Sequence, residues 1–191
     1  MKEIKDLLFY NARSVNSWIN KDISEEVIKE LYDLVIMGPT SFNSLPMRLI
    51  FVRSSEAKER LKSCMIEKNI EKTITSPYVA IIGMDNNFPD EFVNTFPGRD
   101  IKSFFAGNQS LIETTAMRNS SLQGAYLILA ARLLGLDVAP MSGFDNAKVD
   151  EEFFKGTSIK SNFICALGYA DHSKTYPRLP RPDFDKYAKI V

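Results

Sequence analysis

Cysteine and histidine are scarce in this chain of 191 residues, and no single sign of charge dominates. The two cysteines, Cys64 and Cys165, lie far apart and form no ligand-spaced pair, so we expect neither a disulfide scaffold nor a structural zinc site. The 24 Lys and Arg residues balance the 24 Asp and Glu residues, which argues against nucleic acid or an anionic membrane as a partner.

Targeting signals and the common cofactor motifs are also missing. The first residues, MKEIKDLLFYNARS, include acidic side chains and no long apolar run, so we expect no signal peptide or transmembrane segment and a cytoplasmic location. No G-x-G-x-x-G, G-x-x-x-x-G-K-[ST] or H-E-x-x-H occurs, so Rossmann, P-loop and zincin sites lack their signatures. The single histidine, His172, follows Asp171 in a polar stretch, and no nucleophile elbow is present. A hydrolase triad is therefore not expected, and His172 is predicted to be a solvated loop residue.

The composition is that of a globular protein, with 45% hydrophobic and 25% charged residues, and the length fits one domain over 1–191. The first half of the chain predicts a helix capped by Ser24 and ending at Gly38, a strand over 48–52, a polar helix capped by Ser55 and reaching about Lys68, and a strand over 78–84. An irregular aromatic segment over 85–107 and an apolar helix over 122–136 follow. The remaining elements are a short strand and glycine turn before Asp145, a capped segment over 145–154, a strand over 162–167 and a proline-rich tail over 176–183. Strands interleaved with helices, without regular βαβ alternation, predict an α+β sandwich.

The helix over 122–136 is apolar on more than one face. Its only strongly polar side chains are Gln123 and Arg132, so it should be buried nearly all round. A chain of this size would struggle to enclose such a helix alone. We therefore predict that it lies at the centre of a homodimer, the alternative being a central core helix in a monomer.

The turn Pro140–Phe144, which follows this helix, points to a ligand. Gly143 has no Cβ, so a planar ligand can approach the peptide, and Pro140 stiffens the preceding backbone. Together with the helix and a late Arg-Leu-Pro, this turn resembles the nitroreductase-like family of flavin mononucleotide (FMN) oxidoreductases. The resemblance implies that the backbone around Pro140, Met141, Ser142 and Gly143 contacts the flavin ring near its reactive nitrogen.

Four further segments match the pattern of that family in the same order. In Ala12–Asn16, the resemblance implies that Arg13 and Ser14, with Asn16, hold the FMN phosphate, although many relatives have a basic residue at the Asn16 position. In the loop Pro39–Pro46, it implies that Pro39, Thr40, Ser41 and Asn43 contact the flavin of the partner subunit; Leu45 replaces a common glutamine.

The third segment is Asn69–Lys72, similar to the N-x-x-K of the family, in which the amide and the ammonium meet the pyrimidine side of the ring. A cation there stabilises the negative charge that this edge acquires on reduction. The last is Tyr176–Arg181, whose prolines present Arg178 and Arg181 towards the phosphate; relatives place a basic residue at the Tyr176 position. Each segment alone also fits an ordinary role, as a helix start, a loop, a helix end or a stiff tail.

The resemblance implies a nitroreductase-like α+β sandwich with a mixed or antiparallel sheet, forming a domain-sharing homodimer with FMN at the subunit interface. Hydride would pass from NADH or NADPH through flavin N5 to a small acceptor, with no metal and no required catalytic side chain. Phe104 and Phe105 are predicted to border the acceptor pocket. Segments such as Arg118–Tyr126 are most similar to the malonic semialdehyde reductase or 3-hydroxypropionate dehydrogenase subgroup, which suggests an aldehyde. The alternatives are a broad nitro or quinone reductase and a flavin-binding protein without turnover.

Overall fold

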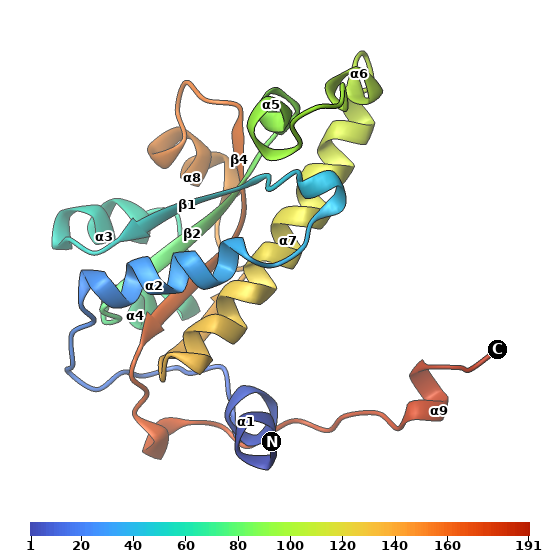
Figure 1. Cartoon of the computed structure of the whole chain (residues 1–191). Coiled ribbons are helices and arrows are strands. Elements are labelled where there is room, and N and C mark those ends of the chain that lie inside the picture. The colour runs from blue at the N-terminus through green and yellow to red at the C-terminus, as the bar shows by residue number, and fades with distance from the viewer.

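An antiparallel sheet of four strands forms the middle layer of the computed structural model, which describes residues 1–191 (Figure 1). The strands are β1 (Met47–Val52), β2 (Tyr78–Asp85), β3 (Asp137–Met141) and β4 (Ile159–Gly168), and their order is β1-β2-β4-β3. β2 and β4 are therefore central, and both are apolar on their two faces. The predicted α+β sandwich is confirmed, and its sheet is antiparallel.

Successive side chains of the central strands enter two separate cores, because side chains alternate across a sheet. Val79 and Ile81 of β2 belong to one core, whereas Ala80 and Ile82 belong to the other. The first core lies under α3 (Ser55–Lys62) and α8 (Asn146–Phe153), and the second lies under α2 (Glu25–Ile36) and α7 (Gln109–Leu133). Helices on both faces explain why these strands are continuous hydrophobic runs.

Most predicted elements are confirmed with small changes at their ends. α2 begins after Ser24 and ends at Ile36, and α8 begins after Asp145, whose carboxylate accepts a hydrogen bond from Lys148 N. β2 and β4 contain the predicted strands, and β4 is longer at both ends. The segment after β2, predicted to be irregular, contains three short helices, which are η3 (Phe88–Glu91), α5 (Phe92–Thr95) and α6 (Lys102–Phe105).

The single polar helix predicted from Ser55 to about Lys68 is wrong. The chain forms α3, leaves helical geometry after Lys62, and forms a second helix, α4 (Glu67–Ile74). The break occurs because Met65 forms a β-bridge with Phe144, a tertiary contact that local sequence does not reveal. The cap is also one residue earlier, since Ser54 rather than Ser55 accepts the hydrogen bond from Ala57 N.

α7 is longer and less buried than predicted. It begins at Gln109, capped by Asn108, so the predicted 122–136 segment covers only its second half and runs past its last residue, Leu133. In a single chain this helix is not buried all round, because Leu122 is 42% exposed and Leu133 is 51% exposed. One apolar face of α7 therefore lies open.

Both ends of the chain lie away from the sheet. The N-terminus forms α1 (Lys2–Lys5) and a π-helical turn, η1 (Asp6–Tyr10), which the sequence did not predict. The tail after Thr175 passes the N-terminal segment, which Arg178 contacts, and then extends away with a short helix, α9 (Phe184–Tyr187), at a distance from the body (Figure 1). The tail exposes large apolar side chains that contact little in this chain, among them Leu179 and Tyr187.

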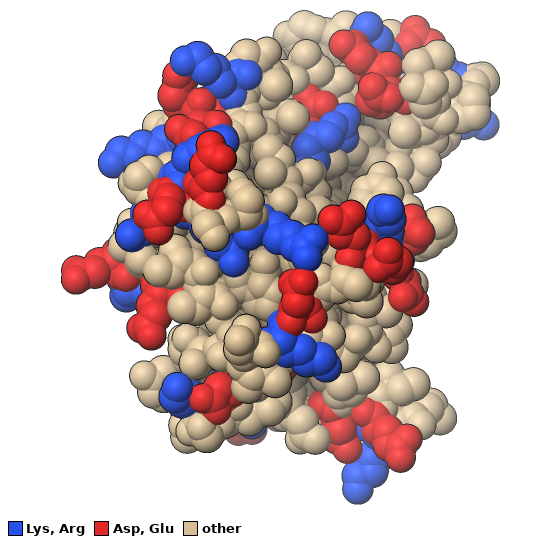
Figure 2. All heavy atoms as spheres, turned by 90° about the vertical axis from the view of Figure 1, so that its left-hand side faces the viewer, with Lys and Arg blue, Asp and Glu red and all other residues tan.

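Charges of the two signs are mixed on the side of the molecule where α3 lies (Figure 2). Several are paired across elements, such as Arg53 with Asp22 at 2.8 Å and Arg48 with Asp85 at 2.8 Å. Both cysteines are free and buried, and burial raises the pKa of Cys165 to about 12. None of the helices combines the length and the apolar character that crossing a bilayer requires.

Candidate functional site

The predicted Asn69–Lys72 and Pro140–Phe144 segments meet in the structure. Gly143 O accepts hydrogen bonds from Ile66 N at 3.2 Å and from Asn69 Nδ2 at 3.0 Å. A Cβ on Gly143 would lie 2.6 Å from Asn69 Nδ2, closer than packing allows. Glycine is therefore required for contact with Asn69, in addition to leaving its peptide open to a ligand.

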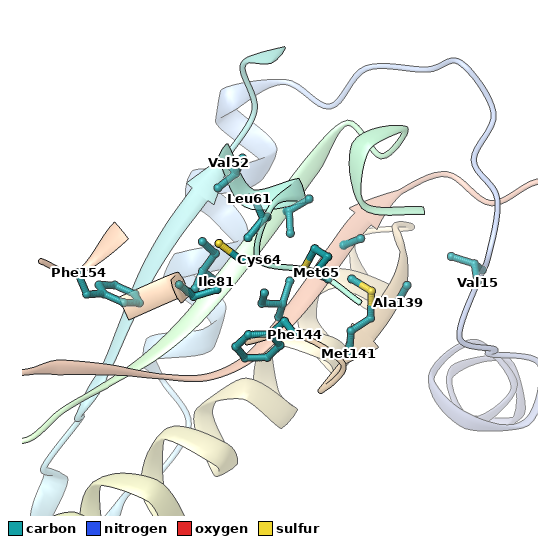
Figure 3. Close-up of a cluster of buried hydrophobic side chains, with 14 of the residues drawn as sticks. Val15, Val52, Leu61, Cys64, Met65, Ile81, Ala139, Met141, Phe144 and Phe154 are labelled. Atoms are coloured by element: carbon teal, nitrogen blue, oxygen red, sulfur yellow. The ribbon is translucent and has the colours of Figure 1, made fainter. Parts of the chain in front are cut away.

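The first core, shown in Figure 3, supports the contact between Asn69 and Gly143. Met65 and Phe144 are buried there and bridge the strand exit to the start of α4. Met141 is also buried, and its sulfur accepts a hydrogen bond from the Thr73 hydroxyl at 3.8 Å, so only its backbone is available to a ligand. Pro140 and Ser142 are exposed beside it.

Lys72 is half-buried and forms no ion pair. Burial, and then the neighbouring charge of Lys68, lowers the pKa of Lys72. Its carbonyl accepts a hydrogen bond from the indole of Trp18 at 2.8 Å, which ties the N-terminal segment to α4. A cation without a carboxylate partner is suited to hold an anionic group.

The predicted phosphate residues gather at the N-terminal segment. Arg178 Nη2 donates to Phe9 O at 2.5 Å and to Ala12 O at 2.8 Å, and Arg13 Nη1 donates to Ala12 O at 2.9 Å. Desolvation, and then repulsion from Arg13 and Arg181, lowers the pKa of Arg178. None of these arginines has a carboxylate partner, so together they form a concentrated positive site.

The N-terminal segment is held against the end of β3. Val15 N donates to Val138 O at 3.1 Å, and Ser14 forms a parallel bridge with Val138. Ser14 and Asn16 themselves are exposed. Three of the five predicted segments and Arg178 are thus linked to one another through β3 and α4.

The loop Gly38–Met47, which we call the site loop, lies elsewhere. Its hydrogen bonds to other elements go to α7, to Thr95 and to Asp85 at the end of β2, not to the group described above; Asn43 Nδ2 donates to Thr95 O at 2.7 Å. Figure 1 shows this loop beside the half of α7 nearer α6, whereas α1 lies near the opposite end. The structure of one chain therefore brings together the predicted phosphate and ring-edge residues, but not Pro39, Thr40, Ser41 and Asn43.

Phe104 and Phe105, predicted to border an acceptor pocket, have different surroundings. Phe105 is 2% exposed and packs with Phe88 and Phe92, beside a cavity of about 160 Å³. Phe104 is 61% exposed, and its ring lies 5.8 Å from that of Phe42, which is also exposed. Phe105 therefore supports the segment from inside, and the aromatic surface open to a ligand is made by Phe104 and Phe42.

His172 does not take part in this site. Its side chain is 75% exposed, and its nearest carboxylate oxygen, on Asp137, is 3.8 Å from Nε2. The prediction of a solvated loop histidine is confirmed.

Comparison with known proteins identifies the chain. The sequence profile described as the nitroreductase family matches residues 11–169. This chain belongs to the nitroreductase family. A protein of Burkholderia lata, provisionally named NADH dehydrogenase/NAD(P)H nitroreductase, is 55% identical over 185 residues, which are 97% of this chain and 95% of the relative.

Solved structures of this family share the fold along the whole chain. A nitroreductase-like protein of Bacillus subtilis has a TM-score of 0.92 at 22% identity, with 100% of both chains covered. A protein of Exiguobacterium sibiricum, solved in complex with FMN, has a TM-score of 0.86 at 20% identity, covering 98% of this chain and 97% of that one. The nitroreductase fold is thus established for residues on both sides of the site.

Some residues that contact the candidate site segments were not predicted to do so. Trp18, Asn119 and Tyr126 each donate or accept a hydrogen bond to the backbone of a predicted site segment. Gln123 was noted as polar but not placed in the site. The available signal was the spacing of Asn119, Gln123 and Tyr126 at i, i+4 and i+7, because this spacing puts the three side chains on one face of the helix.

The pKa direction of Lys72 leads to a stability prediction for the cofactor-free protein. Since the folded pKa lies below its ordinary value of 10.5, the charged form is disfavoured in the folded state at neutral pH. Lys72→Met should therefore leave the free energy of unfolding unchanged or raise it. The difference in the free energy of unfolding between Lys72→Met and the unmodified protein should shrink as the pH rises through the lowered pKa towards 10.5, because Lys72 then loses its charge.

Urea unfolding at several pH values measures this effect. Lys29→Met, at an exposed lysine of α2 that does not affect Lys72, is the control and should change stability by no more than about 0.5 kcal/mol. A loss of more than about 1 kcal/mol in Lys72→Met at neutral pH would show that the ammonium stabilises the fold.

Proposed function

We propose that this chain is an FMN-dependent NAD(P)H oxidoreductase that passes electrons to a small, electron-poor acceptor. The observation that carries the proposal is a set of cations without carboxylate partners: Lys72 lies on the same helix as Asn69, which contacts Gly143, and Arg178 lies beside Arg13 at the N-terminal segment. Such a set fits a ligand with a phosphate at one end and a ring that gains negative charge at the other. The names of relatives, which include NAD(P)H nitroreductase, and the FMN-bound neighbour support this reading.

The residues divide the binding task between them. Arg13 and Arg178, with Arg181 close by, would hold the phosphate, and Lys72 would lie at the pyrimidine edge of the ring. Asn69 and Gly143 would present backbone and amide groups to that ring. Bound FMN would supply the hydride chemistry at N5, and the chain supplies position and electrostatics.

The functional unit is a homodimer with FMN at the subunit interface. Three observations support this: the apolar face of α7 lies open, the tail exposes large apolar side chains, and the site loop is separate from the rest of the site. Exposed apolar patches of this kind mark interaction surfaces. A second copy would cover the open face of α7 and supply the missing loop.

Two classes of acceptor are proposed. A small aldehyde, such as malonic semialdehyde, follows from the resemblance of segments such as Arg118–Tyr126 to that subgroup. An aromatic nitro compound or a quinone is favoured by the exposed rings of Phe42 and Phe104, because flat acceptors stack on such rings. Both reactions need the same cofactor and the same donor.

The visible absorption spectrum of the purified protein tests the proposed cofactor and donor. A flavin spectrum that bleaches under anaerobic conditions on addition of NADPH or NADH is expected. Flavin that stays oxidised with both donors would favour a binding protein without turnover. A colourless protein that takes up no added FMN would overturn the proposal.

Arg178→Ala should weaken FMN binding selectively. Loss of a charge-assisted contact to phosphate corresponds to roughly a 10- to 100-fold rise in Kd. Riboflavin lacks the phosphate, so its Kd should stay the same in the variant. The fluorescence of Trp18, the only tryptophan, provides the titration signal because this residue touches Lys72.

Arg99→Ala is the matched control, since Arg99 is an exposed arginine on the segment between α5 and α6. It should bind both ligands like the unmodified protein. Equal weakening of FMN and riboflavin by Arg178→Ala would mean that the tail arginine acts on structure, not on the phosphate.

Phe104→Ala should distinguish the two acceptor classes. If aromatic acceptors stack on this ring, kcat/KM for nitroaromatics and quinones falls about tenfold, because stacking on an aromatic ring contributes about 1–1.5 kcal/mol. The value for malonic semialdehyde should stay the same. Val93→Ala, at an apolar residue of α5 that is 75% exposed, is the control. An equal fall in kcat/KM for all acceptors would show that the ring of Phe104 does not select aromatic acceptors.

A further inference from the structure

Two buried amides of α7 hold the site loop at its ends. Asn119 Oδ1 accepts a hydrogen bond from Ser41 N at 2.8 Å, and Gln123 Oε1 accepts one from Met47 N at 3.0 Å. Asn119 is 2% exposed and Gln123 is 0% exposed. The Gln123 bond is therefore fully shielded from water and the Asn119 bond partly so, and shielding strengthens a hydrogen bond.

Tyr126 adds a third contact from the same face of the helix. Its hydroxyl donates to Pro39 O at 2.9 Å, and its ring packs directly on Gly38. A Cβ on Gly38 would lie 2.0 Å from this ring, so the loop can approach α7 only with glycine there. We call Asn119, Gln123 and Tyr126 the clamp residues.

The backbone between these contacts is strained. Phe42, Asn43 and Leu45 have φ values of 53°, 51° and 39°, in the left-handed region that glycine favours. Residues other than glycine are unfavourable there, and such strain persists only where the surroundings fix the backbone. Within the loop, the Thr40 hydroxyl accepts a hydrogen bond from Leu45 N at 3.1 Å, but this local bond does not fix the loop ends.

The strained shape decides where the functional groups of the loop lie. It turns the Phe42 ring onto Phe104, with 5.8 Å between ring centroids, and directs Asn43 Nδ2 to Thr95 O. Thr40, Ser41 and Asn43 are the loop residues predicted to contact the flavin. Strain retained at such a place is characteristic of a preorganised binding segment.

Gln123 is buried with only one of its two polar atoms paired. Its Nε2 atom has no hydrogen-bond partner, as is the case for Ser44 Oγ in the loop. A hydrocarbon of similar size would avoid the unpaired donor but would leave Met47 N without an acceptor. What only the amide provides is the acceptor for Met47 N.

We propose that Asn119, Gln123 and Tyr126 are positioning residues, which hold the site loop in its strained shape so that it meets the flavin without further ordering. The proposal rests on the proposed function, because it takes FMN as the ligand. A loop that is preorganised binds with less loss of entropy than one that must be ordered on binding. Release of the clamp should therefore weaken FMN binding while the fold persists.

Two variants on α7 release the clamp, and a control variant on β4, which contacts the same helix, does not. Gln123→Met and Asn119→Leu remove the acceptors for Met47 N and Ser41 N. Asn162→Leu is the matched control, because Asn162 Nδ2 donates to Ser120 and Ser121 of α7 at 2.8 and 2.9 Å and does not touch the loop. Tyr126→Phe removes one hydroxyl only, and keeps the test informative if a larger change prevents folding.

The first measurement is the Kd of FMN for the cofactor-free full-length chain, followed by Trp18 fluorescence. The second is hydrogen exchange of the peptide over 38–47 without FMN. For Gln123→Met and Asn119→Leu we expect a rise in Kd of about tenfold or more, since small misplacements in a preorganised site have effects of this size. Exchange over 38–47 should become faster. Tyr126→Phe should show both effects more weakly, and Asn162→Leu neither.

A rescue separates loop strain from general damage. Leu45→Gly allows a positive φ without strain, so in the Gln123→Met background it should recover part of the FMN affinity.

Faster exchange over 38–47 with an unchanged Kd for FMN would overturn the proposal, because the clamp would then serve the fold alone. Unchanged exchange in the clamp variants would overturn it as well. A wild-type chain that binds no FMN, although its loop is protected from exchange, would instead reject the proposed function, and the positioning role with it.

Discussion

The hydrogen bonds that two buried amides of α7 form with the site loop are the constraint on which this structure depends. α7 packs Leu127 and Ala131 against the sheet, a contact that a helix could make in several rotations. Asn119 and Gln123 remove this freedom, because a buried amide without a partner is unfavourable. Their bonds to the site loop fix the rotation of α7, and the same rotation leaves Leu122 and Leu133 facing outwards. The packing, the loop and the open face are therefore set together.

A second constraint acts through the cations. Arg13, Arg178 and Arg181 lie near one another without carboxylates, and Lys72 is half-buried without an ion pair. Like charges in such proximity disfavour the folded state of the free chain. An anion that binds only the folded chain counteracts this repulsion, since its binding raises the free energy of unfolding by mass action. The cofactor proposed for this site would thus complete the fold as well as the chemistry.

Much of the architecture could be predicted from local patterns, because those patterns act within a few residues. Ser24 and Asp145 precede helices in the expected places, and the apolar run of β2 forms a strand buried on both faces. Long-range contacts account for the errors. The break between α3 and α4 depends on the bridge from Met65 to Phe144, and no local feature of that stretch indicates it.

The site was predictable in part for the same reason. Asn69 and Gly143 were both singled out as ring contacts, but their hydrogen bond to each other depends on the register of α4 against the end of β3. The clamp on the loop was not foreseen, since Asn119 and Tyr126 read as ordinary helix residues until the loop is placed beside them. Nor does a sequence of Phe, Asn and Leu indicate positive φ, which arises here from anchors outside the loop.

The position of the clamp bears on how the site is completed. Asn119 of α7 holds the site loop, and Arg132 of the same helix donates to Leu8 O beside the predicted phosphate residues. The two residues are about 20 Å apart along the helix axis, at a rise of about 1.5 Å per residue. Since both regions are fixed to α7, motion within one chain cannot bring them together without breaking buried hydrogen bonds. A second copy packed on the open face of α7 can supply the loop from outside. The rigidity that holds the site loop in place thus also keeps it apart from the predicted phosphate and ring-edge residues of the same chain.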